Sequence, residues 1–226
     1  MLGIAFLGGV GPAPETLREL ARHADLLAAA DSGLIAAELA GLKPDWVVGD
    51  MDSVGEICPD DIRRLEKYPP ERVLRYPPDK DFTDTELAIT LLREKGCDEI
   101  WLSGGGGGRT DHLLAIYSLF ECEHPPDRWF TANEEIRNLK EGGVLNVSLP
   151  AGSRVSVLPL CVEPWEAESS GLKWPLNGRV WEKGGFGLSN VAVKGPFNII
   201  AKKGRFMVMW DLLCDTPKVI QKAINA

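Results

Sequence analysis

Two aspartates follow a short apolar segment at residues 47–53, where the sequence reads Val-Val-Gly-Asp-Met-Asp-Ser. In an extended chain, residues two positions apart point to the same side, so Asp50 and Asp52 can both face one cation. Mg²⁺ usually takes one or two protein carboxylates and completes its shell with water and substrate phosphates. Such a pair also occurs in ordinary solvated turns, so the interpretation depends on the rest of the chain.

A second acidic stretch, Pro78–Glu86, follows a predicted strand and precedes a predicted helix. Thr83 and Glu86 have the spacing of a capping box at the start of that helix. Lys80 and the aspartates on either side of it therefore lie in a strand-to-helix turn. The alternative is that the acidic residues near Asp84 only compensate the helix dipole.

A run of five glycines, Gly104–Gly108, separates another predicted strand from another helix. Ordering these glycines costs much conformational entropy, and a backbone pressed close to a ligand explains them better than a flexible surface loop. Arg109 and the helix N-terminus would then face phosphate. The run is not a P-loop, because no Gly-Lys-Ser/Thr follows, and it lacks the acidic residue of a dinucleotide fingerprint.

Strands and helices alternate through the first part of the chain, which predicts an α/β fold with a Rossmann-like, mostly parallel sheet and helices on both faces. The expected strands are 3–7, 25–30, 45–49, 72–76, 99–103 and 128–132, and the expected helices are 15–24, 33–40, 84–95 and one after residue 112 with Leu113, Ile116, Tyr117 and Phe120 on one face. Asp31 and Ser32 supply N-cap chemistry for helix 33–40, and Gly41 ends it.

From Gly142 onward the chain consists of short segments, often alternating in polarity and broken by glycine, proline or asparagine, which predicts an all-β sandwich. The expected strands include 144–149, 154–160, 165–169, 172–176, 186–193, 198–202 and 205–212. The expected domains are therefore 1–141 and 142–226. The tail, 217–226, fits either a helix turn or a strand.

Composition and charge exclude several functions. The formal charge of −8 opposes a general nucleic-acid binder, which needs basic surface to displace counterions. No apolar run approaches the roughly 20 residues that span a membrane. The five cysteines, Cys58, Cys97, Cys122, Cys161 and Cys214, are far apart and form no C-x-x-C, which suits reduced thiols in the cytoplasm.

Three strand ends thus carry acidic residues: Asp50 and Asp52, then Asp79, Asp81 and Asp84, then Asp111. Ligands of open parallel sheets bind outside the carboxyl ends of the strands, so these turns should meet in one crevice. So many carboxylates repel one another unless cations lie among them, and Lys80, Arg109 and His112 do not balance their charge. A divalent metal with a metal-bound polyphosphate is the natural ligand.

Three stretches, Gly49–Ser53, Lys80–Glu86 and Gly104–His112, resemble, in order, the signature motifs of the thiamine pyrophosphokinase family. Gly171–Trp174 and Gly187–Asn190 in the β half resemble two further, shorter motifs of that family. The resemblance implies that the pyrophosphoryl group of ATP is transferred to the hydroxyl of thiamine, giving thiamine diphosphate and AMP. It also implies an ATP-binding catalytic α/β domain, a thiamine-binding β-sandwich, and a cytoplasmic homodimer with thiamine bound between subunits.

The resemblance also implies roles for individual residues. Catalysis is assigned to Asp50, Asp52, Asp81, Asp84, Arg109 and Asp111, and Mg²⁺ binding to Asp50, Asp52 and Asp81. ATP binding is assigned to Asp31, Ser32, Lys80, Thr83, Gly107, Gly108 and Arg109, and thiamine binding to Asp111, Trp174, Ser189 and Asn190. Asp111 would orient the acceptor hydroxyl or act as a base.

Four side chains also have simpler interpretations. One histidine after a helix start, His112, is more often a structural hydrogen-bonding residue than a general base. Trp174 would stack on a cationic aromatic ligand or pack in the core. Trp181 and Trp210 are assigned to packing or to a dimer interface.

Two alternative functions remain open at this point. A pyrophosphokinase for another alcohol, such as a hydroxymethyl pterin, would have the same acidic turns, so only the β half or an acceptor screen separates the two. A non-catalytic nucleotide or thiamine sensor would tolerate the loss of metal ligands, whereas every matched acidic position is filled here. A nucleic-acid module is opposed by the charge and by the lack of a basic aromatic stripe.

Overall fold

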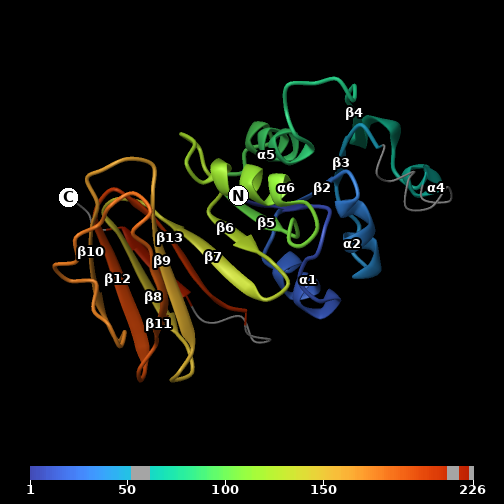
Figure 1. Ribbon diagram of the computed structural model, residues 1–226. Helices are drawn as coiled ribbons and strands as arrows, with labels where there is room; N and C mark the ends of the chain where they lie inside the picture. Colours follow the sequence, from blue (N-terminus) through green and yellow to red (C-terminus); the bar gives the residue numbers. More distant parts are fainter. Residues whose placement is uncertain (52–61, 213–218, 224–226) are drawn as a thin grey trace. The chain divides into compact units, whose positions relative to one another are not determined.

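The computed structural model describes residues 1–51, 62–212 and 219–223 (Figure 1). The chain divides into two compact units. The first contains Met1–Ser118 and Arg128–Asn133, and the second contains Leu119–Asp127 and Glu134–Ala226.

The first unit contains a parallel sheet with strand order β6-β5-β1-β2-β3-β4. Its strands are β1 Leu2–Phe6, β2 Leu26–Ala30, β3 Trp46–Gly49, β4 Val73–Arg75, β5 Glu99–Ser103 and β6 Arg128–Phe130. The central strands are apolar and almost completely buried, as expected for a parallel sheet covered on both faces. The predicted α/β architecture is confirmed.

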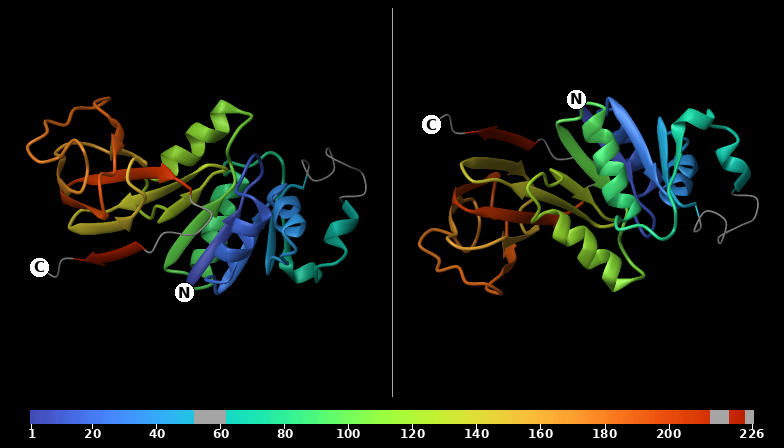
Figure 2. Two further views of the ribbon diagram at one scale, coloured as in Figure 1. Left: turned by 90° about the horizontal axis from the view of Figure 1, so that it is seen from below. Right: turned by 90° about the horizontal axis from the view of Figure 1, so that it is seen from above.

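The helices of this unit are α1 Pro14–Ala21, α2 Gly33–Leu39, α4 Ile62–Leu65, the 3₁₀ helix η2 Pro70–Arg72, α5 Asp84–Glu94 and α6 Thr110–Leu119. Helix α5 packs against β1, β2 and β3, and α2 packs against β1 and β2 (Figure 2). The predicted capping box is present, because the Thr83 side chain accepts from the backbone N–H of Glu86 and the Glu86 carboxylate accepts from the backbone N–H of Thr83. None of the helices in the described part of the chain is long and apolar enough to cross a membrane.

The second unit is built from antiparallel strands in two sheets, in the orders β11-β9-β13-β7 and β10-β12-β8-β14. The strands are β7 Glu134–Leu139, β8 Gly143–Ser148, β9 Arg154–Leu160, β10 Glu166–Ser170, β11 Gly187–Val191, β12 Pro196–Lys203, β13 Arg205–Asp211 and β14 Val219–Ala223. One hydrophobic core draws buried residues from both sheets. The tail, which the sequence left undecided, therefore contains a strand.

The segment 172–176 and the helix α6 differ from the sequence-based expectations. Residues 172–176 do not form a strand, and only Leu172 makes an isolated bridge, to Ala192. Pro175 has no N–H for a ladder, and the backbone groups of Trp174 are bound by a side chain instead. On α6, Ile116 is buried but Leu113 is 39% exposed, so the expected apolar face is covered only in part.

The tryptophans assigned to packing or to a dimer interface lie in the core of the second unit. Trp181 is 6% exposed and contacts Phe206 edge to face, and Trp210 is 1% exposed and contacts Phe197 in the same way. Within the described residues, Cys97 and Cys161 are free thiols. Cys58 and Cys214 lie outside the described residues.

Candidate active site

Three aspartates from different elements come together in the first unit. Asp31 follows β2, Asp50 follows β3, and Asp84 is the first residue of α5. Each supplies one carboxylate oxygen, and these three oxygens lie within 4.8 Å of one another. The parallel strands carry the first two to the same edge of the sheet, and the capped start of α5 brings the third. We call these three residues the carboxylate cluster.

The backbone around the carboxylate cluster is shaped by unusual torsion angles. Asp31 has φ +47°, a conformation that aspartate tolerates better than most residues, and its backbone N–H donates to the carbonyl of Val48 at 2.8 Å. Gly49 has φ +147°, and a Cβ there would lie 3.2 Å from both the Asp31 Cβ and the Asp84 Oδ1. Glycine therefore lets the β3 backbone lie against two members of the cluster.

Lys80 reaches into the carboxylate cluster from the turn between β4 and α5. Its ammonium donates to Asp50 Oδ2 at 2.7 Å and lies 3.2 Å from Asp84 Oδ1. The Lys80 side chain is 13% exposed and the Asp50 side chain 9% exposed, so solvent screens their ion pair weakly. Partial burial lowers the pKa of Lys80, but the bonds to the two carboxylates outweigh it and raise the pKa above its usual value.

The donor set of the carboxylate cluster suits a hard divalent cation. Mg²⁺ and Mn²⁺ prefer oxygen ligands, and three carboxylates with one ammonium leave a formal charge of −2 on this group of four side chains. Asp31, Asp50 and Asp84 are therefore the described residues best placed to hold the metal.

Other residues assigned to the metal or to ATP lie outside this group. Asp81 is exposed and does not join the carboxylate cluster, and Thr83 is exposed and caps α5. Ser32 occupies the N-cap position of α2 without a side-chain cap bond, so the expected N-cap chemistry is not formed. Asp52 lies outside the described residues.

Most of the glycine run has a packing role. A Cβ at Gly104 would lie 2.4 Å from the carbonyl oxygen of Leu7, and one at Gly105 would lie 2.3 Å from the Ile116 side chain. Gly106 and Val10 exchange two backbone hydrogen bonds, of 2.6 and 2.9 Å, that join the run to the turn after β1. Close packing of these two turns thus requires glycine, in addition to any approach of a ligand.

Gly108 is different from the glycines before it. Its φ is +67°, and a Cβ there would have no neighbour within 4 Å. A Cβ at Gly107, in contrast, would lie 2.7 Å from the Val10 side chain. The backbone of Gly108 is therefore open on the side where a Cβ would point, immediately before Arg109 and the start of α6.

Arg109 and Asp111 form a bidentate ion pair at the start of α6. The guanidinium donates to both carboxylate oxygens, at 3.1 and 2.6 Å, and the backbone N–H of His112 donates to one of them at 3.0 Å. The bond from Arg109 is the main cause that holds the pKa of Asp111 at about 2. Both side chains are largely exposed, at 70% and 63%, so either is free to turn toward a ligand.

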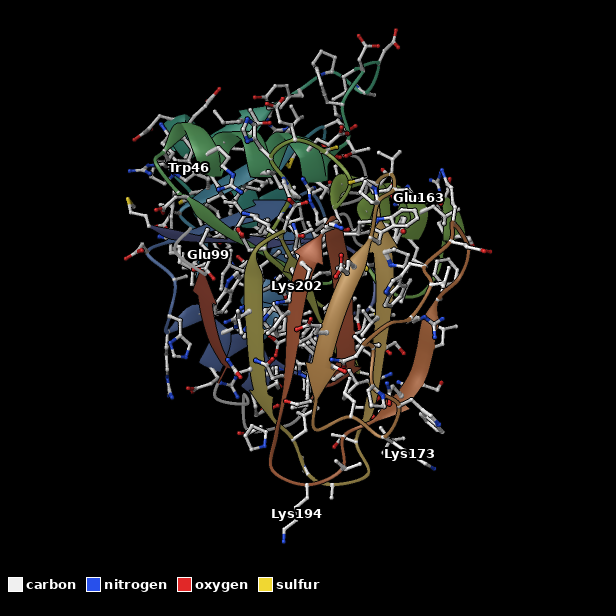
Figure 3. The ribbon with its side chains drawn as sticks, turned by 90° about the vertical axis from the view of Figure 1, so that its left-hand side faces the viewer. Trp46, Glu99, Glu163, Lys173, Lys194 and Lys202 are labelled. Carbon is white, nitrogen blue, oxygen red and sulfur yellow. The ribbon has the colours of Figure 1, made fainter. Side chains whose placement is uncertain are left out.

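In the second unit, Asn190 organises the segment that carries Trp174. The Asn190 amide donates to the carbonyl of Trp174 at 2.6 Å and accepts from its backbone N–H at 3.1 Å, and Asn190 is only 5% exposed. Trp174 is 53% exposed, with the Lys173 ammonium 4.6 Å from its ring centroid. Lys173 lies at the edge of this unit, with its side chain pointing outward (Figure 3). Ser189 is exposed, with φ +56°.

Sequence reasoning placed Asp31 with ATP and did not assign it to the metal. Asp31 follows the strand β2, and Asp50 follows the neighbouring strand β3. Their equivalent positions after adjacent strands were the sequence signal that could have placed them in one site. The left-handed backbone that completes the approach cannot be seen in the sequence.

Comparison with known proteins identifies similar sequences. Residues 17–127 match the family model described as thiamin pyrophosphokinase, catalytic domain. The thiamine pyrophosphokinase of Bacillus subtilis (strain 168) is 30% identical over 156 residues, which are 65% of this chain and 68% of that protein.

Solved structures share the fold over nearly the whole chain. A thiamin pyrophosphokinase from Geobacillus thermodenitrificans has a TM-score of 0.75 at 22% identity and covers 95% of this chain and 99% of its own. The enzyme of the same name from Candida albicans has a TM-score of 0.73 at 18% identity, with 94% of this chain and 89% of its own covered. At these identities the likeness concerns the fold alone.

Proposed function

The chain belongs to the thiamine pyrophosphokinase family, and from this premise we propose that it transfers the pyrophosphoryl group of ATP to the hydroxyl of thiamine, with Mg²⁺ as cofactor. The membership confirms the family predicted from the three acidic motifs, and the matches give no support to a pterin enzyme or a sensor. The observation that carries the proposal is the carboxylate cluster with Lys80 beside it.

In the proposed reaction, the thiamine hydroxyl oxygen bonds to the β-phosphorus of ATP, and the bond from that phosphorus to the α,β-bridging oxygen breaks. AMP leaves with that oxygen, and the hydroxyl proton passes to a base or to solvent. Catalysis of this kind depends mainly on alignment and on neutralising charge on phosphate oxygens.

The metal would be held by Asp31, Asp50 and Asp84. The family resemblance also implies Asp52 and Asp81 as ligands, of which Asp81 does not join the carboxylate cluster. When bound, it would supply neutralisation of phosphate charge and a fixed orientation of the polyphosphate. Gly49 supports this arrangement by keeping the β3 backbone against the carboxylates.

Phosphate binding is proposed for the start of α6. The open backbone of Gly108, the neighbouring Gly107, and the N-terminus of α6 offer N–H groups to an anion. Arg109 is exposed and can exchange the Asp111 carboxylate for phosphate oxygens. Lys80 is a further phosphate ligand, and Ser32 and Thr83 stay proposed contacts to ATP.

Asp111 suits an orienting role better than that of a base. The low pKa of Asp111 depends mainly on the bond from Arg109, so it rises toward its ordinary value once Arg109 turns to phosphate. A carboxylate at its ordinary pKa is ionised at neutral pH and is a weak base, but it accepts a hydrogen bond from a hydroxyl. We therefore propose that Asp111 orients the thiamine hydroxyl once phosphate draws Arg109 away.

Thiamine is proposed to bind at Trp174 and Ser189, with Asn190 holding the Trp174 segment in place. An exposed indole offers a stacking face to a cationic aromatic ring.

A homodimer is proposed as well, because Trp174, Phe186 and Leu188 leave apolar surface exposed on the second unit that a second copy would cover. The proposed location is the cytoplasm, where free thiols persist.

The proposal is tested by incubating purified protein with ATP, Mg²⁺ and thiamine and measuring AMP and thiamine diphosphate. Parallel reactions contain EDTA, or a hydroxymethyl pterin in place of thiamine. Equal amounts of AMP and thiamine diphosphate, abolished by EDTA, are expected. AMP formed only with the pterin would overturn the acceptor, and ADP as the nucleotide product would overturn pyrophosphoryl transfer.

A further inference from the structure

Lys80 contacts two of the carboxylates that would also have to bind the metal. Its ammonium is bonded to Asp50 Oδ2 and lies 3.2 Å from Asp84 Oδ1, and both aspartates belong to the carboxylate cluster. An ammonium that donates at 2.7 Å occupies one lone pair of the carboxylate oxygen it faces, here Asp50 Oδ2. The Lys80 ammonium therefore already binds Asp50 and Asp84, two of the side chains that would hold the metal.

We propose that Lys80 and the divalent cation compete for Asp50 and Asp84, so that metal binding expels the Lys80 ammonium from the carboxylate cluster. This inference rests on the proposed function, since it assumes that the cluster is the metal site.

Charge and geometry both make simultaneous occupation unfavourable. Mg²⁺ binds oxygen ligands at about 2.0–2.1 Å in a near-octahedral shell, so oxygens that now lie within 4.8 Å of one another must turn toward one centre. An ammonium that stayed bonded to two of those carboxylates would lie next to the cation, and like charges repel strongly at a site this poorly exposed to solvent.

The turn that carries Lys80 allows its side chain to leave. The turn is fixed at one end, where the backbone N–H of Tyr76 donates to the carbonyl of Gly49 at 3.0 Å, and at the other by the Thr83 capping box. Between these anchors Asp81 and Phe82 are exposed, and the lysine has four rotatable side-chain bonds.

Expulsion would give Lys80 a second role. Outside the cluster its ammonium is free to meet the phosphate oxygens of a metal-bound polyphosphate. The lysine would thus hold Asp50 and Asp84 together until the metal arrives and then bind the substrate that the metal brings. Lys80 is in this account a positioning residue for the metal site.

The test compares Mn²⁺ binding, without nucleotide, by wild type, Lys80→Met and Lys43→Met, measured by calorimetry. Lys43 is an exposed lysine of the same unit, with its ammonium 5.7 Å from the Tyr68 ring centroid, so its replacement removes the same charge away from the cluster. Lys80→Met should bind Mn²⁺ at least about tenfold more tightly than wild type, and Lys43→Met should not. In EDTA, Lys80→Met should also melt at a lower temperature, because the three carboxylates then repel one another.

If wild type binds Mn²⁺ and Lys80→Met binds it no more tightly, the proposed competition is wrong. The metal site and the proposed function would not be affected by that result. Equal tightening in both variants would also overturn it, as a general charge effect. Absence of Mn²⁺ binding by wild type would overturn the metal site itself, and with it the proposed function.

A measurement on wild type keeps the proposal testable if Lys80→Met does not fold. With ¹³C-labelled lysine, and the Lys80 resonance identified through Lys80→Arg, added Mg²⁺ should shift the Lys80 Cε signal toward the position of exposed lysines and leave Lys43 unchanged. A Lys80 signal that stays in place at saturating Mg²⁺ would contradict expulsion.

Discussion

Replacement of Gly49 by alanine tests how the backbone supports the carboxylate cluster. At φ +147° a non-glycine residue costs about 1–3 kcal/mol of folding free energy. The new Cβ would also lie 3.2 Å from Asp84 Oδ1 and 3.3 Å from Asp84 Cγ, so this carboxylate must move by a few tenths of an ångström. We expect Gly49→Ala to lower the free energy of unfolding by about 3 kcal/mol and Mn²⁺ affinity by about tenfold.

Gly41→Ala is the matched control for this substitution. Gly41 has φ +72° at the end of α2, and a Cβ there meets nothing within 4 Å. Alanine should therefore cost only the backbone strain, about 1–2 kcal/mol, and leave Mn²⁺ affinity unchanged. Urea unfolding and calorimetry measure the two quantities. Equal stability losses in both variants, with Mn²⁺ affinity unchanged in Gly49→Ala, would refute the link between Gly49 and the cluster.

Two further predictions concern the other parts of the proposed site. The Asp111 carboxyl has a folded pKa of about 2, below its ordinary value of 3.8, so its pair with Arg109 persists above about pH 4 and is lost as the pH falls through about 2. Its ¹³C signal should stay flat from about pH 6 to 4, and Arg109→Gln should raise the midpoint; a wild-type midpoint near 4 would contradict the pair. Asn190→Ala should lower the free energy of unfolding by about 2 kcal/mol, since it removes two bonds to the Trp174 backbone, whereas Ser189→Ala should change it by less than about 0.5 kcal/mol. Equal losses in urea unfolding would show that Asn190 does not hold the segment.

Local sequence signals predicted the first unit well. The strand over Glu99–Ser103 was predicted at its observed bounds, because the helix before it ends at Gly96 and the glycine run after it begins at Gly104. The helix start at Asp84 followed from the reciprocal hydrogen bonds of one Thr and one Glu, which need no tertiary contact. Such features depend on neighbours in the sequence, and the sequence therefore predicts them.

The second unit shows where local reasoning fails. Residues 172–176 have the apolar pattern of a strand, yet Asn190 binds both backbone groups of Trp174. This competition comes from a residue 16 positions away, so no local pattern reveals it. For helix α6, the local pattern predicted an apolar face, but the structure covers this face only in part. Leu114 of the same helix is 59% exposed.

The sequence also did not predict which residues make up the carboxylate cluster. Strand-end positions predicted that Asp50 and the Asp84 turn would meet, but the approach of Asp31 depends on left-handed backbone at Asp31 and on the missing side chain at Gly49. Lys80 was predicted to face ATP, and its bond to Asp50 depends on the path of the turn that follows β4. These are tertiary features that spacing alone does not define.

The most direct measurement is product formation from ATP labelled at the β-phosphorus, with thiamine and Mg²⁺, by wild type, Asp50→Asn and Glu66→Gln. Glu66 is exposed in the same unit, so its replacement removes the same charge away from the carboxylate cluster. The account predicts label in thiamine diphosphate with equimolar AMP for wild type and Glu66→Gln, and at least about a hundredfold lower rate for folded Asp50→Asn. A near-normal rate in Asp50→Asn would contradict the claim that the cluster is the catalytic metal site.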